Sequence, residues 1–380
     1  MTTDKHNKRP NVPPLRFPEF TDEWEQHMTT DFFEFKNGLN PDVKRFGTGI
    51  KFISVMDILN NRYITYDKII SAVEAKDDDL RDFGVNYGDI LFQRSSETLE
   101  DVGRANVYLD EKPALFGGFV IRGKRIGDYN PLFFRYLLSS PSVRKRIIVK
   151  GAGAQHFNIG QDGLSKVSLF VPSAKEQDRI AQLLNAIDKR IEVQSGLIEK
   201  LESLISGIIE RITAQSPNVR IADCLDCHSS TLQENQLNEA GGYRVYGANG
   251  ICGYTDNPGI NCDAILIVKD GSGVGNVSYA MGEYSVIGTS NYLTAKNGYS
   301  LRYLYFSLKK FNFAPYKTGM AIPHIYFKDY GKAKIYCPSL EEQERIANNL
   351  SKIERKIEIE RSIKDCCIVQ KQYLLQQMFI

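Results

Sequence analysis

One short motif has the spacing of a metal or haem ligand set. Cys224-Leu-Asp-Cys227-His228 fits the C-x-x-C-H haem pattern, and a C-x-x-C pair also occurs in zinc and redox sites. Haem attachment needs export, and the polar Met1–Pro14 does not resemble a secretory signal. A zinc site with His228 would need one more ligand, such as Cys252 or Cys262, and no second paired knuckle supports it. We expect buried, reduced thiols and no metal.

Three further patterns resemble fragments of enzyme sites. Gly271-Ser-Gly-Val-Gly-Asn276 looks like a glycine-rich nucleotide loop, but no helix start follows it, so a hairpin turn is expected. Asn130-Pro131-Leu132 falls short of the Asn-Pro-Pro-aromatic motif of adenine methyltransferases, and Asp77-Asp78-Asp79 is expected to be a solvated acidic loop. The sequence therefore predicts no catalytic site in this chain.

Basic residues are concentrated twice, although the net charge is only +2. Residues 122–150 contain eight Lys or Arg against Asp128 alone, and residues 296–334 contain eight against Asp329 alone. Both stretches are interleaved with Tyr, Phe, Ser and Asn, which suits phosphate contacts combined with base-edge contacts. Two such stretches in one chain favour DNA over an ordinary solvated helix face.

The elements that position these stretches form a tandem repeat. Residues 172–191 and 338–357 are identical at half of their aligned positions, beginning Pro-Ser and continuing through Glu-Gln to Arg-Ile-Ala. Upstream, Asp89–Arg94 matches Ala264–Lys269 as a strand leading into a turn. Helical apolar patterns follow at 131–138 and 301–308, then a Gly and His loop and a short strand in each half.

Each repeat ends in a long helix with a coiled-coil pattern. Pro-Ser followed by acidic residues marks both helix starts. The apolar spacing then alternates four and three, with Gln194 the one polar member in the first helix and a weaker middle at Glu360 and Lys364 in the second. The seam residues are Ile180, Leu184, Ile187, Ile191, Ile198, Leu201, Ile205, Ile346, Leu350, Ile353 and Ile357. Helices of about 35 to 40 residues, at about 1.5 Å each, would be rods of roughly 50 to 60 Å.

These patterns predict an α+β protein with two globular domains separated by two long helices that pair as an antiparallel coiled coil, in a tandem repeat with approximate twofold symmetry. The predicted boundaries are 1–172 for the first domain with an N-terminal extension, 173–215 for the first helix, 216–338 for the second domain and 339–380 for the second helix. No apolar run is long enough to cross a bilayer, and we expect a cytoplasmic protein.

The repeated Pro172–Ala181 and Pro338–Ala347 motif, the opening Leu15–Trp24 and the segment Gly88–Arg94 resemble the DNA specificity subunits of type I restriction-modification systems. The resemblance covers nearly the whole chain. It implies that each globular region is a target recognition domain for one half of a split DNA sequence. It also implies that the helices set the distance between the halves and dock two methyltransferase (modification) subunits, with restriction/translocase subunits joining the complex. S-adenosylmethionine, ATP and Mg²⁺ would be used by those partner subunits.

We therefore predict a non-catalytic subunit that binds double-stranded DNA. The alternatives are a coiled-coil adaptor without DNA affinity and, third, a nucleic-acid-modifying enzyme. Arg to guanine and Asn or Gln to adenine are the natural base contacts. His156 and His324 are either such contacts or structural histidines. The candidate DNA-binding residues are Arg94, Ser95, Arg104, Arg144, Lys145, Arg146, Gln155, His156 and Asn158 in the first domain, and Lys269, Ser272, Asn276, Lys317, Thr318 and His324 in the second.

Overall fold

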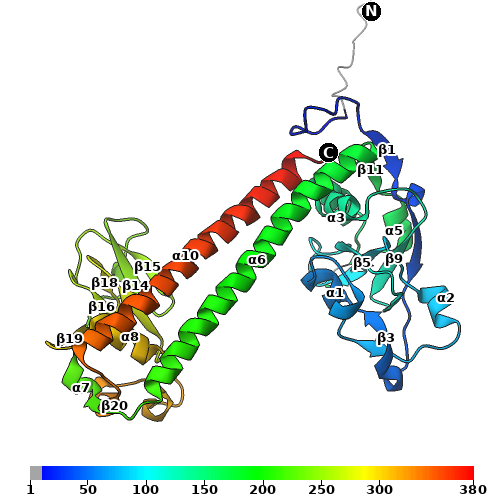
Figure 1. The fold of residues 1–380 in the computed structure, drawn as a ribbon. Helices are drawn as coiled ribbons and strands as arrows, with labels where there is room; N and C mark the ends of the chain where they lie inside the picture. Colours follow the sequence, from blue (N-terminus) through cyan, green and yellow to red (C-terminus); the bar gives the residue numbers. More distant parts are fainter. Residues whose placement is uncertain (1–10, 154) are drawn as a thin grey trace, which may run out of the picture. The chain divides into compact units, whose positions relative to one another are not determined.

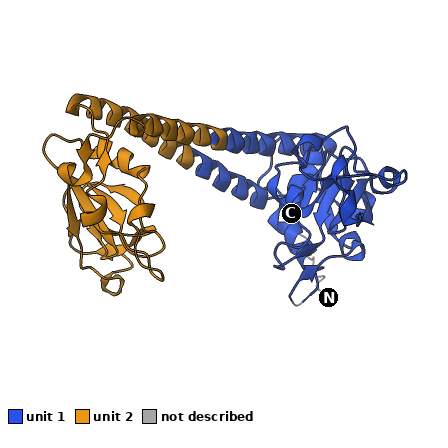
Figure 2. Cartoon of the chain, turned by 90° about the horizontal axis from the view of Figure 1, so that it is seen from below, with its two compact units in different colours: residues 1–194, 363–380 blue, residues 195–362 orange. Residues whose placement is uncertain are grey.

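The structure is a computed structural model that describes residues 11–153 and 155–380, and its contacts divide the chain into two compact units. The first unit runs to Gln194 and takes in Ile363–Ile380, whereas the second is Ser195–Ser362. The division therefore cuts both long helices, as the colours in Figure 2 show. The predicted four-part division cuts the chain at the helix ends instead and stays a prediction.

The first unit holds a four-stranded sheet, a three-stranded sheet and two pairs of short strands, together with several short helices and the start of a long helix (Figure 1). Its strands are β1 (Glu25–Met28), β2 (Phe33–Asn37), β3 (Phe46–Ile53), β4 (Ala72–Val73), β5 (Ile90–Gln93), β6 (Ser95–Ser96), β7 (Ala105–Val107), β8 (Leu115–Phe116), β9 (Val120–Arg125), β10 (Phe157–Asn158) and β11 (Ser168–Val171). Its helices are α1 (Val55–Asn60), α2 (Asp79–Phe83), α3 (Pro131–Ser139), α4 (Pro141–Ile148), α5 (Gln161–Ser165) and the beginning of α6 (Ala174–Thr213).

The second unit repeats this order with fewer elements. Its strands are β12 (Val219–Arg220), β13 (Leu225–Ser229), β14 (Tyr243–Gly247), β15 (Gly250–Thr255), β16 (Ala264–Val268), β17 (Val277–Ala280), β18 (Ser285–Val286), β19 (Ser290–Ala295) and β20 (Lys334–Ile335). Its helices are α7 (Ile221–Cys224), α8 (Leu301–Lys309), α9 (Phe327–Tyr330) and most of α10 (Leu340–Gln377).

The sheet topology is the same in both units. The order β2-β9-β5-β7 in the first unit matches β13-β19-β16-β17 in the second, and both sheets are antiparallel. A three-stranded sheet accompanies each, β4-β3-β8 and β15-β14-β18, and contains one parallel pair. The predicted α+β repeat with mostly antiparallel strands is confirmed, and the mixed second sheet is an addition that the sequence did not reveal.

The most apolar strand of each unit is buried on both faces. In β16, Ile265 and Ile267 join the core that contains α8, while Leu266 faces a smaller core around Tyr284. Side chains alternate along a strand, so a continuous apolar run supplies both cores at once. The first unit uses β5 in the same way, because Phe92 and Leu91 belong to different clusters.

The long helices α6 and α10 pair within each unit through the predicted seam. In the first unit, Ile180, Leu184 and Ile187 share a core with Leu374 of α10 and with Met378, directly after that helix. The pairing is antiparallel: Trp24 contacts both Glu176 and Phe379, whereas Asp188 pairs with Lys371 further along. In the second unit, the seam residues in the core are Ile198, Leu201, Ile205, Ile346, Leu350, Ile353 and Ile357.

The repeated Glu-Gln motif fixes the start of each long helix. Gln177 Oε1 accepts a hydrogen bond from the backbone N–H of Asn130 at 3.0 Å, and its Nε2 donates to the Pro172 carbonyl at 3.0 Å. Gln343 makes the same two bonds, to the N–H of Ser300 at 3.0 Å and to the Pro338 carbonyl at 2.9 Å. Both glutamines are buried. Each therefore ties the entry of a long helix to the N-terminus of α3 or α8.

Each long helix carries a carboxylate at the same position of the repeat, the buried Asp188 and the half-buried Glu354. Asp188 accepts bonds from Arg135, Tyr136 and Lys371, and Glu354 accepts bonds from Arg302, Tyr305 and Lys309. Cations and a hydroxyl around each carboxylate offset the cost of burying its charge. Within the described residues, no helix is both long and apolar enough to cross a membrane.

Candidate nucleic-acid interface

Directly after β16, an inner strand of the four-stranded sheet, backbone hydrogen bonds join Lys269 and Asp270 to Thr289 and to the segment Thr318–Ile325. We call this arrangement of polar residues the ladder. After β16, the N–H groups of Lys269 and Asp270 donate to the Thr289 carbonyl at 2.9 and 3.3 Å. The Lys269 carbonyl accepts from the N–H of Ile325 at 2.9 Å, and Thr318 and His324 exchange two backbone bonds of 2.8 and 2.7 Å. His324 Nδ1 lies 2.7 Å from Asp270 Oδ1.

The first unit builds the same ladder with other side chains. The N–H of Arg94 donates to the Phe119 carbonyl at 2.9 Å, and the Arg94 carbonyl accepts from Ile159 at 2.9 Å. Asn158 exchanges two backbone bonds of 2.9 Å with Ala152, and its side chain accepts a hydrogen bond from the Ser95 hydroxyl. Three side-chain positions therefore correspond between the units: Arg94 with Lys269, Ser95 with Asp270, and Asn158 with His324.

The remaining loop candidates surround these ladders. Gln155 and His156 are exposed in the turn before β10. Ser272 and Asn276 are exposed in the turn between β16 and β17, which confirms the expected hairpin in place of a nucleotide loop. Gly271 donates its N–H to the Pro323 carbonyl at 3.0 Å, so this turn lies against the hairpin that holds Thr318. Lys317 is exposed directly before that hairpin.

The basic stretch 122–150 does not form one continuous surface. Arg122 is buried and donates to the Gly84 carbonyl. Arg144 donates to the carbonyls of Glu100 and Val102 at 2.8 and 2.7 Å. Burial lowers the pKa of Arg144 to about 10, which leaves it protonated at neutral pH. Covalent neighbours in a helix point in different directions, and the linear charge pattern cannot show this.

Of the candidates 144–146, only Lys145 is exposed, and no hydrogen bond or ion pair of its side chain occurs among the described residues. Arg146 donates to the Ser168 carbonyl at 3.2 Å and stacks on the Phe170 ring. Arg104 is exposed and pairs with Asp101. The role of all these residues in DNA binding stays a prediction, with Lys145 the best placed of them.

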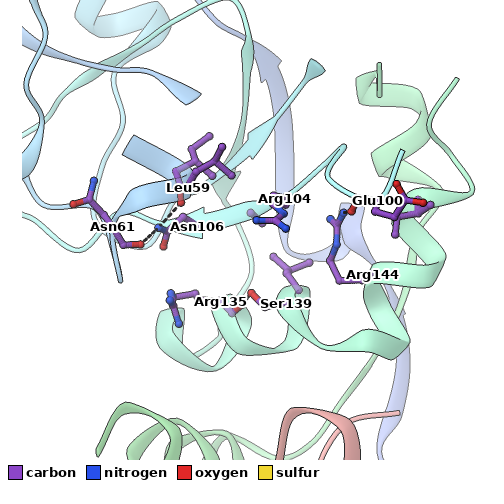
Figure 3. Close-up of a pocket in the computed structure, with 12 residues that line it drawn as sticks. Leu59, Asn61, Glu100, Arg104, Asn106, Arg135, Ser139 and Arg144 are labelled. Atoms are coloured by element: carbon purple, nitrogen blue, oxygen red, sulfur yellow. Dashed lines mark hydrogen bonds between the residues drawn. The ribbon is translucent and has the colours of Figure 1, made fainter. Parts of the chain in front are cut away.

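Arg104 and Arg144 line a cleft of about 420 Å³ between β7 and helices α1, α3 and α4 (Figure 3). Arg135 lies across from them, and Asn106 bridges to the carbonyls of Ile58 and Asn61. Arg135 is committed to Asp188, and Arg104 to Asp101. Arg144 is committed to two backbone carbonyls and the other two arginines to carboxylates, so the cleft is not a ready anion site.

The cysteine motif is divided between α7 and β13. Cys224 is buried in α7, whereas His228 lies in β13, where it stacks on Tyr292. Burial raises the pKa of the Cys227 thiol to about 11. Among residues 11–153 and 155–380, no cluster of three or more His, Cys, Asp or Glu is arranged to hold a metal ion.

One expectation about the acidic residues is wrong. Asp79 is not solvated, because it is buried at the start of α2 and pairs with Arg45. The N–H of Lys76 also donates to it, at 2.8 Å. The backbone N–H and Arg45 together lower the pKa of this carboxyl, although burial opposes them as the largest influence. A run of three aspartates gives no sign of which one turns inward.

The sequence reading missed two residues of the ladders. Asp270, directly after Lys269, pairs with His324, and Phe119 is exposed beside Arg94. Asp270 could have been found by continuing the alignment of the repeats one residue beyond Lys269. Phe119 carries no such signal, since only the turn between β8 and β9 brings it next to Arg94.

Comparison with known proteins agrees with this duplicated arrangement. The family model described as "Type I restriction modification DNA specificity domain" matches residues 21–203 and again residues 218–365. The chain is 26% identical over 183 residues to the type I restriction enzyme EcoKI specificity subunit of Escherichia coli (strain K12), an alignment that covers 47% of this chain and 37% of that protein.

A second relative is the putative type I restriction enzyme MjaX specificity subunit of Methanocaldococcus jannaschii, 24% identical over 211 residues, 54% of this chain and 49% of that protein. The matches thus span half or less of these relatives. The crystal structure of a type I restriction-modification S subunit from M. genitalium shares the fold, with a TM-score of 0.69 and 18% identity over 97% of this chain and 99% of that one.

Proposed function

The chain belongs to the family of type I restriction modification DNA specificity domains, and from this we propose that it reads a bipartite DNA sequence, one half with each unit. The observation that carries the proposal is the duplicated ladder. Arg94, Ser95 and Asn158 in one unit stand at the positions of Lys269, Asp270 and His324 in the other. The cation can contact a phosphate, while the two hydrogen-bonding side chains beside it can contact the edge of a base.

Differences between the ladders give each unit its own specificity. Ser95 and Asn158 offer a hydroxyl and an amide, and an Asn side chain fits the paired donor and acceptor of adenine. Asp270 and His324 offer a carboxylate and an imidazole, which suit different base edges. Because the two units share a fold but present different side chains, we expect the two half-sites to differ in sequence.

The long helices would hold the half-sites at a set distance and dock partners. We place two methyltransferase subunits on them, with restriction and translocase subunits joining through those. S-adenosylmethionine, ATP and Mg²⁺ would be bound and used by the partner subunits, and the complex would act in the cytoplasm. This chain would contribute recognition and assembly without catalysing a step itself.

A salt series on DNA binding tests the proposal. Binding to duplex DNA should weaken steeply as salt rises, because each phosphate neutralised contributes about −0.9 to the slope of log K against log salt. A coiled-coil adaptor would bind the methyltransferase subunits but show no DNA affinity at any salt concentration. Methyl transfer or DNA cleavage by the purified chain without partners would instead support the enzyme alternative.

A further inference from the structure

The hairpin Thr318–His324 of the second unit presents apolar side chains to solvent at its tip. Met320 is fully exposed, and Ile322 is 59% exposed. Single exposed apolar side chains are common on protein surfaces, so the case for a contact rests on the support and the charges around these two.

The tip is held firmly at its base. Thr318 and His324 close it with two backbone bonds of 2.8 and 2.7 Å, and the Pro323 carbonyl accepts from the N–H of Gly271 at 3.0 Å. Gly319 has a φ of +89°, and a Cβ there would lie 2.3 Å from the Ile322 carbonyl oxygen. The turn therefore requires glycine, and its geometry projects the two apolar side chains from a braced support.

The surroundings of the tip are basic. Lys317 precedes the hairpin and Lys269 lies at its base, where the carboxylate of Asp270 is paired with His324. Cations around an apolar tip match DNA, whose phosphates flank an apolar stack of bases.

The corresponding hairpin of the first unit has a different tip. Ala152 and Asn158 close it as Thr318 and His324 do, but it exposes Gln155 and His156 instead of apolar groups. Residue 154 lies outside the described residues. The apolar tip is thus a feature of the second unit, and the fold itself does not demand it.

We infer that Met320 and Ile322 form a wedge that enters the DNA at the half-site read by the second unit and partly unstacks a base step there. This inference rests on the proposed function and names one contact within it. Methionine and isoleucine are among the side chains that proteins insert between base pairs, and the widened step brings more of the duplex against the protein.

The test uses the complex of the full chain with its methyltransferase subunits, without S-adenosylmethionine. Its DNA is the target mapped from modified adenines, with 2-aminopurine placed in turn at each position of both half-sites. Unstacking raises the fluorescence of this base. We expect a severalfold rise at one step of a single half-site in addition to any signal at the methylated adenines. The added signal should be lost in the double variant Met320→Ser, Ile322→Ser, while the other signals remain.

Met281→Ser is the matched control, because Met281 is 71% exposed in a different turn of the same unit and should leave the signal unchanged. If the wild-type complex binds the DNA but no base step shows fluorescence that depends on Met320 and Ile322, the wedge is wrong and the proposed function stays intact. If the double variant instead no longer assembles with the methyltransferase subunits, the tip is a protein contact and the inference is wrong. Failure of the wild-type complex to bind the mapped DNA would refute the proposed function itself.

Discussion

Gln343 Oε1 accepts a hydrogen bond from the backbone N–H of Ser300 at 3.0 Å, and Gln177 makes the same bond to Asn130 in the other repeat. The most similar segment of the two repeats, 172–191 and 338–357, therefore includes a glutamine that joins a long helix to a recognition unit. Its conservation within the chain is explained by this junction and not by a catalytic role.

Replacing this glutamine should destabilise the second unit. Gln343→Ala leaves the Ser300 N–H and the Pro338 carbonyl without their partner, at a cost of about 1–3 kcal/mol for a buried polar group. The free energy of unfolding from urea titration measures the loss. Asn348→Ala, at an exposed position of the same helix, is the control. A loss no greater than that of the control would show that the junction contributes nothing.

A second stability prediction concerns the carboxylate between α6, α10 and α3. Asp188→Ala would leave Lys371 and Arg135 near one another without their buried partner, so we expect a loss of about 3–5 kcal/mol. The exposed Glu199→Ala in the same helix should change stability by less than about 0.5 kcal/mol. Equal effects of the two substitutions would contradict the role given to Asp188.

Two neighbouring basic residues of α4, Arg144 and Lys145, should differ in their effects on DNA binding and on folding stability. Lys145 is exposed, so Lys145→Ala should reduce the salt slope of DNA binding by about 1 and leave folding stability unchanged. Arg144→Ala should instead lower stability by about 1–3 kcal/mol, because it removes two hydrogen bonds to backbone carbonyls. A salt slope unaffected by Lys145→Ala would place this helix away from DNA.

Thiol labelling as a function of pH tests the absence of a metal at the cysteine motif. With a pKa of about 11, Cys227 should be about one-thousandth thiolate at pH 8 and label slowly, and its rate should rise about tenfold per pH unit up to that pKa. The exposed Cys262 and Cys366 should label first. Mass spectrometry identifies the labelled sites. Labelling of Cys227 that is independent of pH and is released by a chelator would indicate a bound metal.

Periodic and repeated features of the sequence were enough to predict the architecture. Apolar spacing along α6 gives the seam because the same period governs the helix everywhere, and aligning the repeats pairs Arg94 with Lys269. What sequence could not predict depends on direction and proximity. Arg144 turns toward two carbonyls while Lys145 does not, and Phe119 reaches Arg94 only through a turn of the mixed sheet.

The central claim is that two units read separate half-sites at a distance set by the helices. Its most direct test is to insert four residues into each long helix, after Gln194 and after Ser362, where the contacts divide the chain. Four residues in a coiled coil make a stutter that locally unwinds the supercoil without ending the seam.

Mapping modified adenines in the genome of cells that express this variant with its partner subunits then gives both the sequences of the half-sites and the length of the gap between them. Four residues lengthen a helix by about 6 Å, close to two base-pair rises of about 3.4 Å, so we expect unchanged half-site sequences separated by a gap about two base pairs longer. Changed half-site sequences with an unchanged gap would contradict the account.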